Sequence, residues 1–360
     1  MTLKKTKRLL SIAGGGIRGL IPLHYLALLE RDLVNSGKYE SIFDAFDFFA
    51  GTSVGSLIVG SIVYTDCRNI SDLIEKYFNK ENMSQIFYRS YIDKITGLLL
   101  DRPKYNGIFK TILIKEAVGK KQFCDHSGKH VLIPTYNISL QKAKFYKSYK
   151  LINPNLLENT ITSASPLLTN TIINLPKLTC LLPRSESMMS LFLEEDDLIN
   201  VADILDASSA APCYFPSVSI TNSDSINEYC IDGAIFANNP VDAAYADALQ
   251  LYPNTDIKIL SIGTGSSDYP KLGPESKQFG LLHWILKGSL IELLIGINQD
   301  ISDYKVKSFA EALGHTYINV QESSVNVAID DITQIDNMIV IAGEWYKKTS
   351  KEVLRDIFDI

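Results

Sequence analysis

The sequence predicts an α/β fold in which a mainly parallel sheet is covered by helices on its faces. Short apolar segments alternate with longer segments of helical spacing, and glycine-rich turns separate them. Repeated strand–turn–helix units of this kind favour a parallel sheet, because each helix returns the chain to the same edge. The 360 residues are 46% hydrophobic and 21% charged, which is ordinary for a globular chain and sufficient for a sizeable core.

The N-terminal part of the chain shows this alternation most clearly. Residues 54–64 are apolar on every side, which indicates a helix that is buried all round. Residues 66–118 carry helical patterns with many aromatic side chains and predict a helical insertion. The other elements expected before residue 120 are a strand over 8–13, a helix over 20–33 and a strand over 44–50.

The remaining segments continue the alternation after one interruption. Residues 153–200 contain four prolines and no clear period, so we expect an irregular excursion there. A helix expected over 240–252 has Asn239 as its N-cap and Pro240 at its first position. The other expected elements are a strand hairpin over 131–146, a helix over 201–211, strands over 229–232 and 257–262, and a mostly helical stretch over 266–360.

The charge distribution argues against nucleic acid as a partner. The formal net charge is -6 at pH 7, and no aromatic residues are interleaved with a basic stripe. One basic cluster lies at the N-terminus, where it forms either a solvated tail or a weak contact with an anionic membrane. Its members are Lys4, Lys5, Lys7 and Arg8.

Cysteine usage and hydropathy limit the setting of the chain. The five cysteines are odd in number and show no C-x-x-C spacing, which argues against a disulfide framework or a structural zinc site and favours a reducing compartment. The apolar start is interrupted by Arg18, and residues 281–297 contain Lys287 and Glu292. Neither segment therefore predicts a signal peptide or a membrane span, and 281–297 predicts an amphipathic helix.

A candidate nucleophile lies where the second expected strand turns into the buried helix. Residues 51–55 (GTSVG) match the G-x-S-x-G pattern of a nucleophile elbow, in which glycines leave room for a tight turn that exposes Ser53. The amide-rich end of the following helix would face a developing oxyanion. The alternative interpretation is an ordinary glycine-rich turn in which Ser53 only caps the helix.

A glycine cluster follows the first expected strand. Residues 14–19 (GGGIRG) fit a dinucleotide fingerprint, an oxyanion-binding loop with bared backbone amides, or a plain tight turn. A dinucleotide site needs an acidic residue at the end of the second strand, where this chain has residues 50–53 (AGTS). An oxyanion loop explains the glycines and Ser53 together, with Arg18 fixing the loop or attracting an anionic head group.

The base for this serine has two candidates. A Ser-His-Asp triad needs a late histidine, and His315, just before a further strand pattern, is the one suitable member of five. The alternative is Asp232, which follows an apolar strand and precedes a helix start. Because a free carboxylate has a pKa of about 4, a Ser-Asp pair needs a partly desolvated carboxylate within hydrogen-bond reach of the serine.

Taken in order, these segments resemble bacterial patatin-like phospholipases. Beyond the glycine cluster and the elbow, the resemblance is carried by residues 207–216 (ASSAAPCYFP) and 232–234 (DGA), and more weakly by 262–265 (IGTG). It covers about residues 8–265. It implies a three-layer α/β/α fold and a Ser-Asp dyad without histidine. The implied site residues are Ser53 as nucleophile, Asp232 as base, and the amides of Gly14, Gly15 and Gly16 as oxyanion hole, with Arg18 supporting the loop.

The reaction implied by the resemblance is cleavage of carboxylic esters of lipids through an acyl-serine, of the phospholipase A or lysophospholipase type, without metal or cofactor. The expected partners are a phospholipid or lysophospholipid and a transient membrane surface, and a protein activator is left open. We expect a cytoplasmic or peripheral membrane location without a cleavable signal peptide. Export as an effector is left open as well.

The resemblance also divides the chain. We expect a catalytic domain over 1–265 and a C-terminal part over 266–360 packed on the same unit. The stretches 66–118 and 153–200 are expected to shape the acyl groove, with the apolar residues Met188, Met189, Leu191 and Phe192 offering lipid contacts. Two positions depart from the family pattern, since Ala13 stands where an aspartate is common and Ser56 where a glycine is common. Neither belongs to the dyad.

Overall fold

A mixed sheet forms the centre of the molecule. The computed structural model describes residues 5–67, 69–89, 102–151, 198–221, 225–265, 274, 277, 290–321 and 325–360. The strand order is β5-β6-β3-β2-β1-β7-β8, and β4 pairs with β3 beside this path. The strands are β1 Thr6–Ile12, β2 Phe48–Gly51, β3 His130–Asn137, β4 Lys142–Lys147, β5 Val218–Thr221, β6 Asn227–Asp232, β7 Asp256–Ile262 and β8 Thr316–Val320.

Parallel pairing dominates the centre of this sheet. β1 pairs in parallel with β2 and β7, and the same direction continues to β3 on one side and β8 on the other. The pairs β3–β4, β3–β6 and β5–β6 are antiparallel. The predicted mainly parallel sheet is therefore correct for the centre, and an antiparallel group extends one edge.

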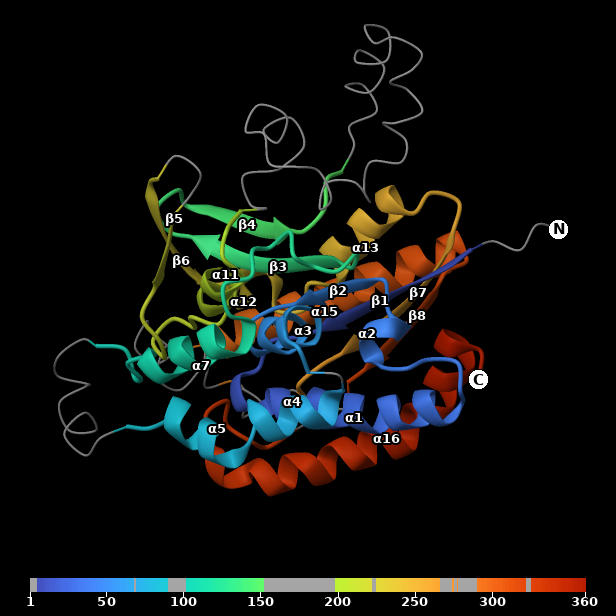
Figure 1. Ribbon diagram of the computed structural model, residues 1–360, viewed down its shortest axis with the longest axis horizontal. Coiled ribbons are helices and arrows are strands. Elements are labelled where there is room, and N and C mark those ends of the chain that lie inside the picture. Colours follow the sequence, from blue (N-terminus) through green and yellow to red (C-terminus); the bar gives the residue numbers. More distant parts are fainter. Residues whose placement is uncertain are drawn as a thin grey trace, which may run out of the picture.

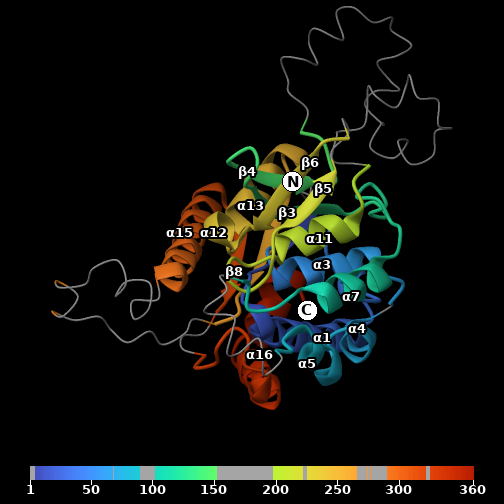
Figure 2. The same ribbon diagram turned by 90° about the vertical axis from the view of Figure 1, so that its left-hand side faces the viewer.

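Helices cover both faces of the sheet, as Figures 1 and 2 show. One face carries α1 Leu20–Asn35, α3 Val54–Tyr64 and α16 Ile335–Phe358, with α4 Ile70–Lys76, α5 Lys80–Ile86, α7 Ile108–Val118 and α11 Val201–Ser208 grouped around α3. The other face carries α12 Ala234–Ala237, α13 Val241–Leu251 and α15 Leu290–Leu313. This arrangement confirms the predicted three layers.

Side chains of each strand alternate between the two layers, since successive residues of a strand point to opposite faces. On β1, Leu10 and Ile12 join the core beneath α1, α3 and α16. Leu9 joins a second core beneath α13 and α15. All three are at most 1% exposed. A strand that is apolar on both faces needs helices on both sides, which explains the continuous apolar runs in the sequence.

One strand, β3, brings two strand ends together. Its first residues pair with β2, Ala50 opposite Leu132, and its last residues pair with β6, Asp232 opposite Thr135. Because β4 occupies the other side of β3, both β2 and β6 lie on the same side. β2 runs parallel to β3 and β6 antiparallel, so the two strands approach head to head. The partners of Ala50 and Asp232 on β3, Leu132 and Thr135, lie about 10 Å apart along the strand.

Most expected elements are present, with two local corrections. The strand expected over 44–50 was too long, because Ile42–Ala45 forms the short helix α2 with Ser41 as its N-cap. The helix expected from Pro240 begins at Val241, and Pro240 itself is the N-cap. The Asn239 side chain still accepts a hydrogen bond from the Val241 amide at 3.2 Å, so it serves the helix start from one residue further away.

The C-terminal part, where it is described over 290–321 and 325–360, contains helices and one strand. α15, α16 and a short 3-10 helix at Ile332–Gln334 flank β8, which pairs with β7. The excursion expected over 153–200 lies outside the described residues up to 197, and so does the part of 281–297 before residue 290. None of the helices in the described ranges is long and apolar enough to cross a membrane.

Candidate active site

Ser53 occupies a strained turn between β2 and α3. Its backbone has φ 56° and ψ −126°, a conformation that an L residue adopts at a cost of about 1–3 kcal/mol. The Ser53 amide donates a hydrogen bond to Oγ of Ser208 at 3.3 Å. Although Ser53 stands at the N-cap position of α3, its side chain makes no capping hydrogen bond. The alternative of a serine that only caps the helix therefore does not hold, and the hydroxyl is available for chemistry.

Both glycines of the elbow are required by close backbone contacts. A Cβ on Gly51 would lie 2.3 Å from the carbonyl oxygen of Gly55. A Cβ on Gly55 would lie 2.2 Å from the carbonyl oxygen of Ile12, at the end of β1. Neither contact can be relieved by rotating a side chain, since backbone atoms are on both sides. These glycines allow α3 to start directly against the sheet with Ser53 at its tip.

Asp232 lies at the end of β6 with one carboxylate oxygen unused. The residue is 1% exposed, and its Oδ1 accepts a hydrogen bond from the Ala234 amide at 2.8 Å. Its Oδ2 is buried and accepts no hydrogen bond of normal geometry from the described residues. Burial raises the pKa of Asp232 to about 6, although the nearby Ser53 hydroxyl and the Ala234 amide favour the ionised form and lower it. The structure thus brings the two predicted dyad residues together.

The end of α11 ties the two halves of this pair to each other. Oγ of Ser208 accepts from the Ser53 amide and donates to the carbonyl of Pro134 at 2.8 Å. Two residues further on, the carbonyl of Ala210 accepts a hydrogen bond from the Asp232 amide at 3.0 Å. One turn of chain therefore holds both Ser53 and Asp232, and it belongs to the ASSAAP segment singled out in the sequence.

The glycine loop lies directly against the nucleophile. A Cβ on Gly14 would stand 3.0 Å from the Ser53 Cβ, so only glycine fits there. The Gly14 carbonyl accepts a hydrogen bond from Thr264 Oγ1 at 2.8 Å, and the Gly15 carbonyl accepts from the Arg18 amide at 3.2 Å and from Arg18 Nε at 3.5 Å. The Gly14 carbonyl shares a peptide group with the Gly15 N–H, and the Gly15 carbonyl shares one with the Gly16 N–H. In a trans peptide the N–H points opposite to the carbonyl, so these hydrogen bonds fix the directions of both amides.

The amide of Gly14, which we expected in the oxyanion hole, already has a hydrogen-bond partner. It donates a hydrogen bond to the carbonyl oxygen of Asn238 at 2.9 Å. The Asn238 side chain also reaches back to the Gly14 carbonyl at 3.5 Å. Gly14 is therefore held on both sides by Asn238, and the amides of Gly15 and Gly16 are the ones in this loop that donate to no described residue.

Two histidines, His315 and His130, lie away from this site. His315 precedes β8 and shares a hydrogen bond with the Tyr245 hydroxyl at 2.7 Å. Since β8 is parallel to β2, the residue before β8 belongs to the opposite edge of the sheet from the residue after β2. His130 begins β3 at that same distant edge and contacts Tyr252. A triad through His315 is excluded by this geometry.

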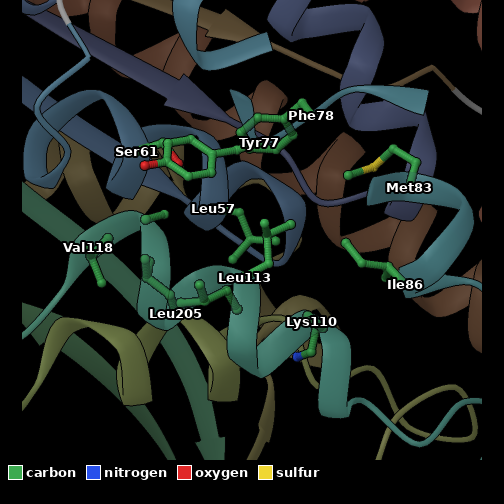
Figure 3. A pocket seen from close by; sticks show the side chains of 12 residues that line it. Leu57, Ser61, Tyr77, Phe78, Met83, Ile86, Lys110, Leu113, Val118 and Leu205 are labelled. Atoms are coloured by element: carbon green, nitrogen blue, oxygen red, sulfur yellow. The ribbon is translucent and has the colours of Figure 1, made fainter. Parts of the chain in front are cut away.

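An apolar pocket lies beside α3 on the face that carries Ser53. Leu57 and Ser61, one and two turns after Ser53, point into it, and Leu113 closes it from α7 (Figure 3). Lys110 stands at its rim, with its nitrogen turned away from Leu57 and Leu113. The other lining residues are Tyr77, Phe78, Met83, Ile86, Ile114, Ala117, Val118 and Leu205.

Sequence reasoning assigned no role to several residues of this site. Ser208 and Thr264 lie inside segments that carried the resemblance, but nothing in the pattern says which atoms they contact. The position of Lys110 in the sequence could have indicated its importance. It shares the buried stripe of α7 with Ile114 and Val118, at spacings of four residues, and a lysine at a core position of a helix demands a partner.

Comparison with known proteins identifies the family of the chain. The family model described as patatin-like phospholipase matches residues 10–245. The chain is 26% identical to "Patatin-like protein 2" of Oryza sativa subsp. indica, over 94% of this chain and 83% of that relative. It is also 26% identical to the "cGAMP-activated phospholipase" of Vibrio cholerae, over 93% of this chain and 86% of that relative.

Solved structures give more distant matches. VipD from Legionella pneumophila aligns with a TM-score of 0.30 and 11% identity, over 93% of this chain and 67% of that chain. Human GIVD cytosolic phospholipase A2 aligns with a TM-score of 0.32 and 13% identity, over 78% of this chain and 45% of that chain. The family model alone spans more than half of the sequence. The chain therefore belongs to the patatin-like phospholipases, a family of lipid hydrolases.

Proposed function

We propose that this protein is a phospholipase A or lysophospholipase that cleaves carboxylic esters of lipids with Ser53 as nucleophile and Asp232 as base. One observation carries the proposal. A buried carboxylate with a free oxygen lies beside the hydroxyl of a serine that is held on a strained elbow. A hydroxyl that neither caps its helix nor lies in bulk solvent, next to an available base, is the arrangement expected of an activated nucleophile.

Acylation follows from this arrangement. Asp232 Oδ2 takes the hydroxyl proton of Ser53 while the serine oxygen attacks the ester carbonyl carbon. The tetrahedral intermediate collapses by breaking the bond between the carbonyl carbon and the alcohol oxygen. The leaving alcohol takes the proton from Asp232, so the carboxylate is regenerated and the acyl group stays on Ser53.

Deacylation repeats the same steps with water. Asp232 accepts a proton from a water molecule, whose oxygen attacks the acyl carbon. The second intermediate releases Ser53, which recovers the proton from Asp232, and the fatty acid leaves. One carboxylate thus acts as base and then as acid in each half-reaction, which suits a group whose pKa lies near the working pH.

The oxyanion of each intermediate is placed on the amides of Gly15 and Gly16. These two donate to no described residue, and their directions are fixed through the carbonyls of Gly14 and Gly15. The Val54 amide, at the start of α3, is a further donor with no partner inside the helix. In this proposal Gly14 supplies space beside Ser53, while its own amide stays with Asn238.

The apolar pocket beside α3 is proposed to receive the end of the acyl chain. It begins one helical turn from Ser53, about 6 Å along α3, and all but two of its lining residues are apolar or aromatic. Its volume is about 40 Å³, which admits only a few methylene groups unless α5 and α7 move apart. Binding of a full acyl chain therefore requires these helices to separate.

The test is a lipid-product assay on purified protein. Wild type and Ser53→Ala are incubated with phospholipid vesicles and with lysophospholipid, and fatty acids are measured by mass spectrometry. Because the Vibrio cholerae relative is described as cGAMP-activated, each reaction is run with and without cGAMP. Wild type should release fatty acid in at least one condition and Ser53→Ala in none. Equal release by a folded Ser53→Ala protein would overturn the proposal.

A further inference from the structure

A buried lysine beside the dyad has no part in the reaction steps described above. Lys110 of α7 is 4% exposed. Its Nζ lies 2.7 Å from Oδ1 of Asp206, and it donates to the Asp206 carbonyl at 2.8 Å and to Ser209 Oγ at 2.9 Å. Placing a cation here is costly, since an apolar residue of similar size avoids the loss of hydration. The position therefore calls for a reason beyond the packing of α7.

All the acceptors of Lys110 belong to the turn that holds the dyad. Asp206 and Ser209 flank Ser208, whose Oγ accepts from the Ser53 amide. The next residue, Ala210, accepts from the Asp232 amide. The ammonium group also stands at the C-terminal end of α11, where the backbone carbonyls favour a positive charge. Lys110 thus holds in place the segment to which both Ser53 and Asp232 are hydrogen-bonded.

The charge of Lys110 also acts on the catalytic carboxylate. Burial lowers the pKa of Lys110, while Asp206 and, more weakly, Asp232 raise it. In return, the positive charge of Lys110 lowers the pKa of Asp232 and so opposes the effect of burial, which raises it. Two further carboxylates lie in this region. Asp203 of α11 interacts with Lys115 and also with Asp206, whereas Glu228 of β6 accepts a hydrogen bond from Asn137.

We infer that Lys110 is a positioning residue of the hydrolysis, which fixes the α11 turn shared by Ser53 and Asp232 and sets a buried positive charge near the Asp232 carboxylate. This inference rests on the proposed function of the dyad. Asp206 is its counter-ion, and Thr111 completes the arrangement by donating to Asp206 Oδ2 at 2.6 Å. Without the lysine, the buried Asp232 carboxylate would lose the cation that helps it to stay ionised.

The test uses a double variant, because Lys110→Met alone would leave the Asp206 carboxylate buried without its cation. Lys110→Met with Asp206→Asn removes both charges and keeps an acceptor for Thr111. Lys115→Met, an exposed lysine of the same helix, is the matched control, and Asp206→Asn alone keeps the cation. Hydrolysis of a soluble short-chain ester is measured from pH 5 to 9, with thermal unfolding at each end.

The double variant should lose about threefold or more of kcat/KM below pH 6 relative to wild type, and much less at pH 9, because its acid limb moves to higher pH. In both controls, Lys115→Met and Asp206→Asn, the acid limb of the pH profile should stay where it is in wild type or move to lower pH. A folded double variant whose profile is parallel to that of wild type at every pH would overturn the inference, and so would an equal upward movement in Asp206→Asn. If wild type itself shows no turnover that depends on Ser53, the proposed function fails instead.

Discussion

At the scale of single residues, Asp232 has the properties that the proposed base requires. A solvated aspartate is a weak base, whereas burial raises the pKa of this one to about 6. At pH 7 most molecules still carry the ionised form, so the group is both available and more basic than an ordinary aspartate. The Ala234 amide donates to Oδ1, which leaves Oδ2 as the oxygen that can take the proton.

The first prediction concerns the pH dependence of hydrolysis. Asp232 must be ionised to accept the proton, so kcat/KM should fall as pH decreases through about 6. The loss should approach tenfold for each further pH unit below that point. A pH series on a soluble ester checks this. An acid limb near pH 4, the range of a solvated aspartate, would show that burial does not control the base.

The second prediction links activity to stability. In the folded protein the pKa of Asp232 is raised from 3.8 to about 6, so the ionised form destabilises the fold above pH 6 and the penalty disappears below pH 4. A shift of about two units corresponds to about 3 kcal/mol. Asp232→Asn should therefore unfold at higher urea concentration than wild type at pH 8 while losing activity, and the two should converge at pH 4. A less stable variant at pH 8 would contradict this reasoning.

The sequence points to the two proposed reacting residues more readily than to the residues that hold them. Ser53 and Asp232 lie in short local patterns, so their positions could be predicted without knowledge of the fold. The contacts of Ser208, Thr264 and Lys110 join residues far apart in the chain, for example Thr264 to the Gly14 carbonyl. Such contacts depend on the packing of α11 and on the neighbouring ends of β1 and β7, which no local pattern specifies.

At the scale of elements, the direct contact between β1 and α3 sets the place of the nucleophile. Gly55 lies against the Ile12 carbonyl, and Gly19 faces the Val54 side chain from the other glycine segment. The two glycine-rich turns are therefore stacked on each other. Any side chain between them would lift the start of α3 from the sheet and move Ser53 away from Asp232.

The third prediction follows from this contact. Gly55→Ala would place a Cβ 2.2 Å from the Ile12 carbonyl, so it should destabilise the protein by about 1–3 kcal/mol and reduce activity. Gly343→Ala is the control, because Gly343 lies in α16 with nothing near its absent Cβ. That change should stabilise α16 by about 0.5–1 kcal/mol. Urea unfolding of both variants tests the contrast, and equal stabilities would argue against a close fit at the elbow.

The direction of β6 was beyond what the sequence could specify. A strand parallel to β2 would also bring Asp232 to the edge that carries Ser53, because parallel strands end at one edge of a sheet. β6 is in fact antiparallel to β3, and Asp232 reaches Ser53 because β6 ends opposite the end of β2. A six-residue strand has the same alternation in either direction, so only pairing with a neighbour decides its orientation.

At the scale of the whole molecule, the last helix completes the layer that contains α1. Met338 and Trp345 of α16 are at most 3% exposed, and Tyr346 packs edge to face on Tyr25 at 5.2 Å between ring centroids. Tyr346 also donates a hydrogen bond to Asp32 of α1. Residues after the segment matched by the family model thus contribute to the same core. Where the chain divides into domains stays a prediction.

The fourth prediction tests this contribution. Met338→Ala removes a fully buried side chain from the contact of α16 with α1 and should cost about 2–4 kcal/mol of unfolding free energy. Val340→Ala is the control, since Val340 is 59% exposed on the same helix. Its effect should stay within about 0.5 kcal/mol. Similar losses in the two variants would mean that α16 is not part of the cooperative fold.

The most direct test of the central claim is covalent labelling of Ser53 by a fluorophosphonate, followed by intact-protein and peptide mass spectrometry. Wild type should gain one adduct, located on the peptide that contains Ser53, and Ser53→Ala should gain none. Asp232→Asn should be labelled about 100-fold more slowly at pH 8, because the hydroxyl has lost its base. An adduct on another residue, or labelling of Asp232→Asn at the wild-type rate, would contradict the Ser53–Asp232 pair as the reacting centre.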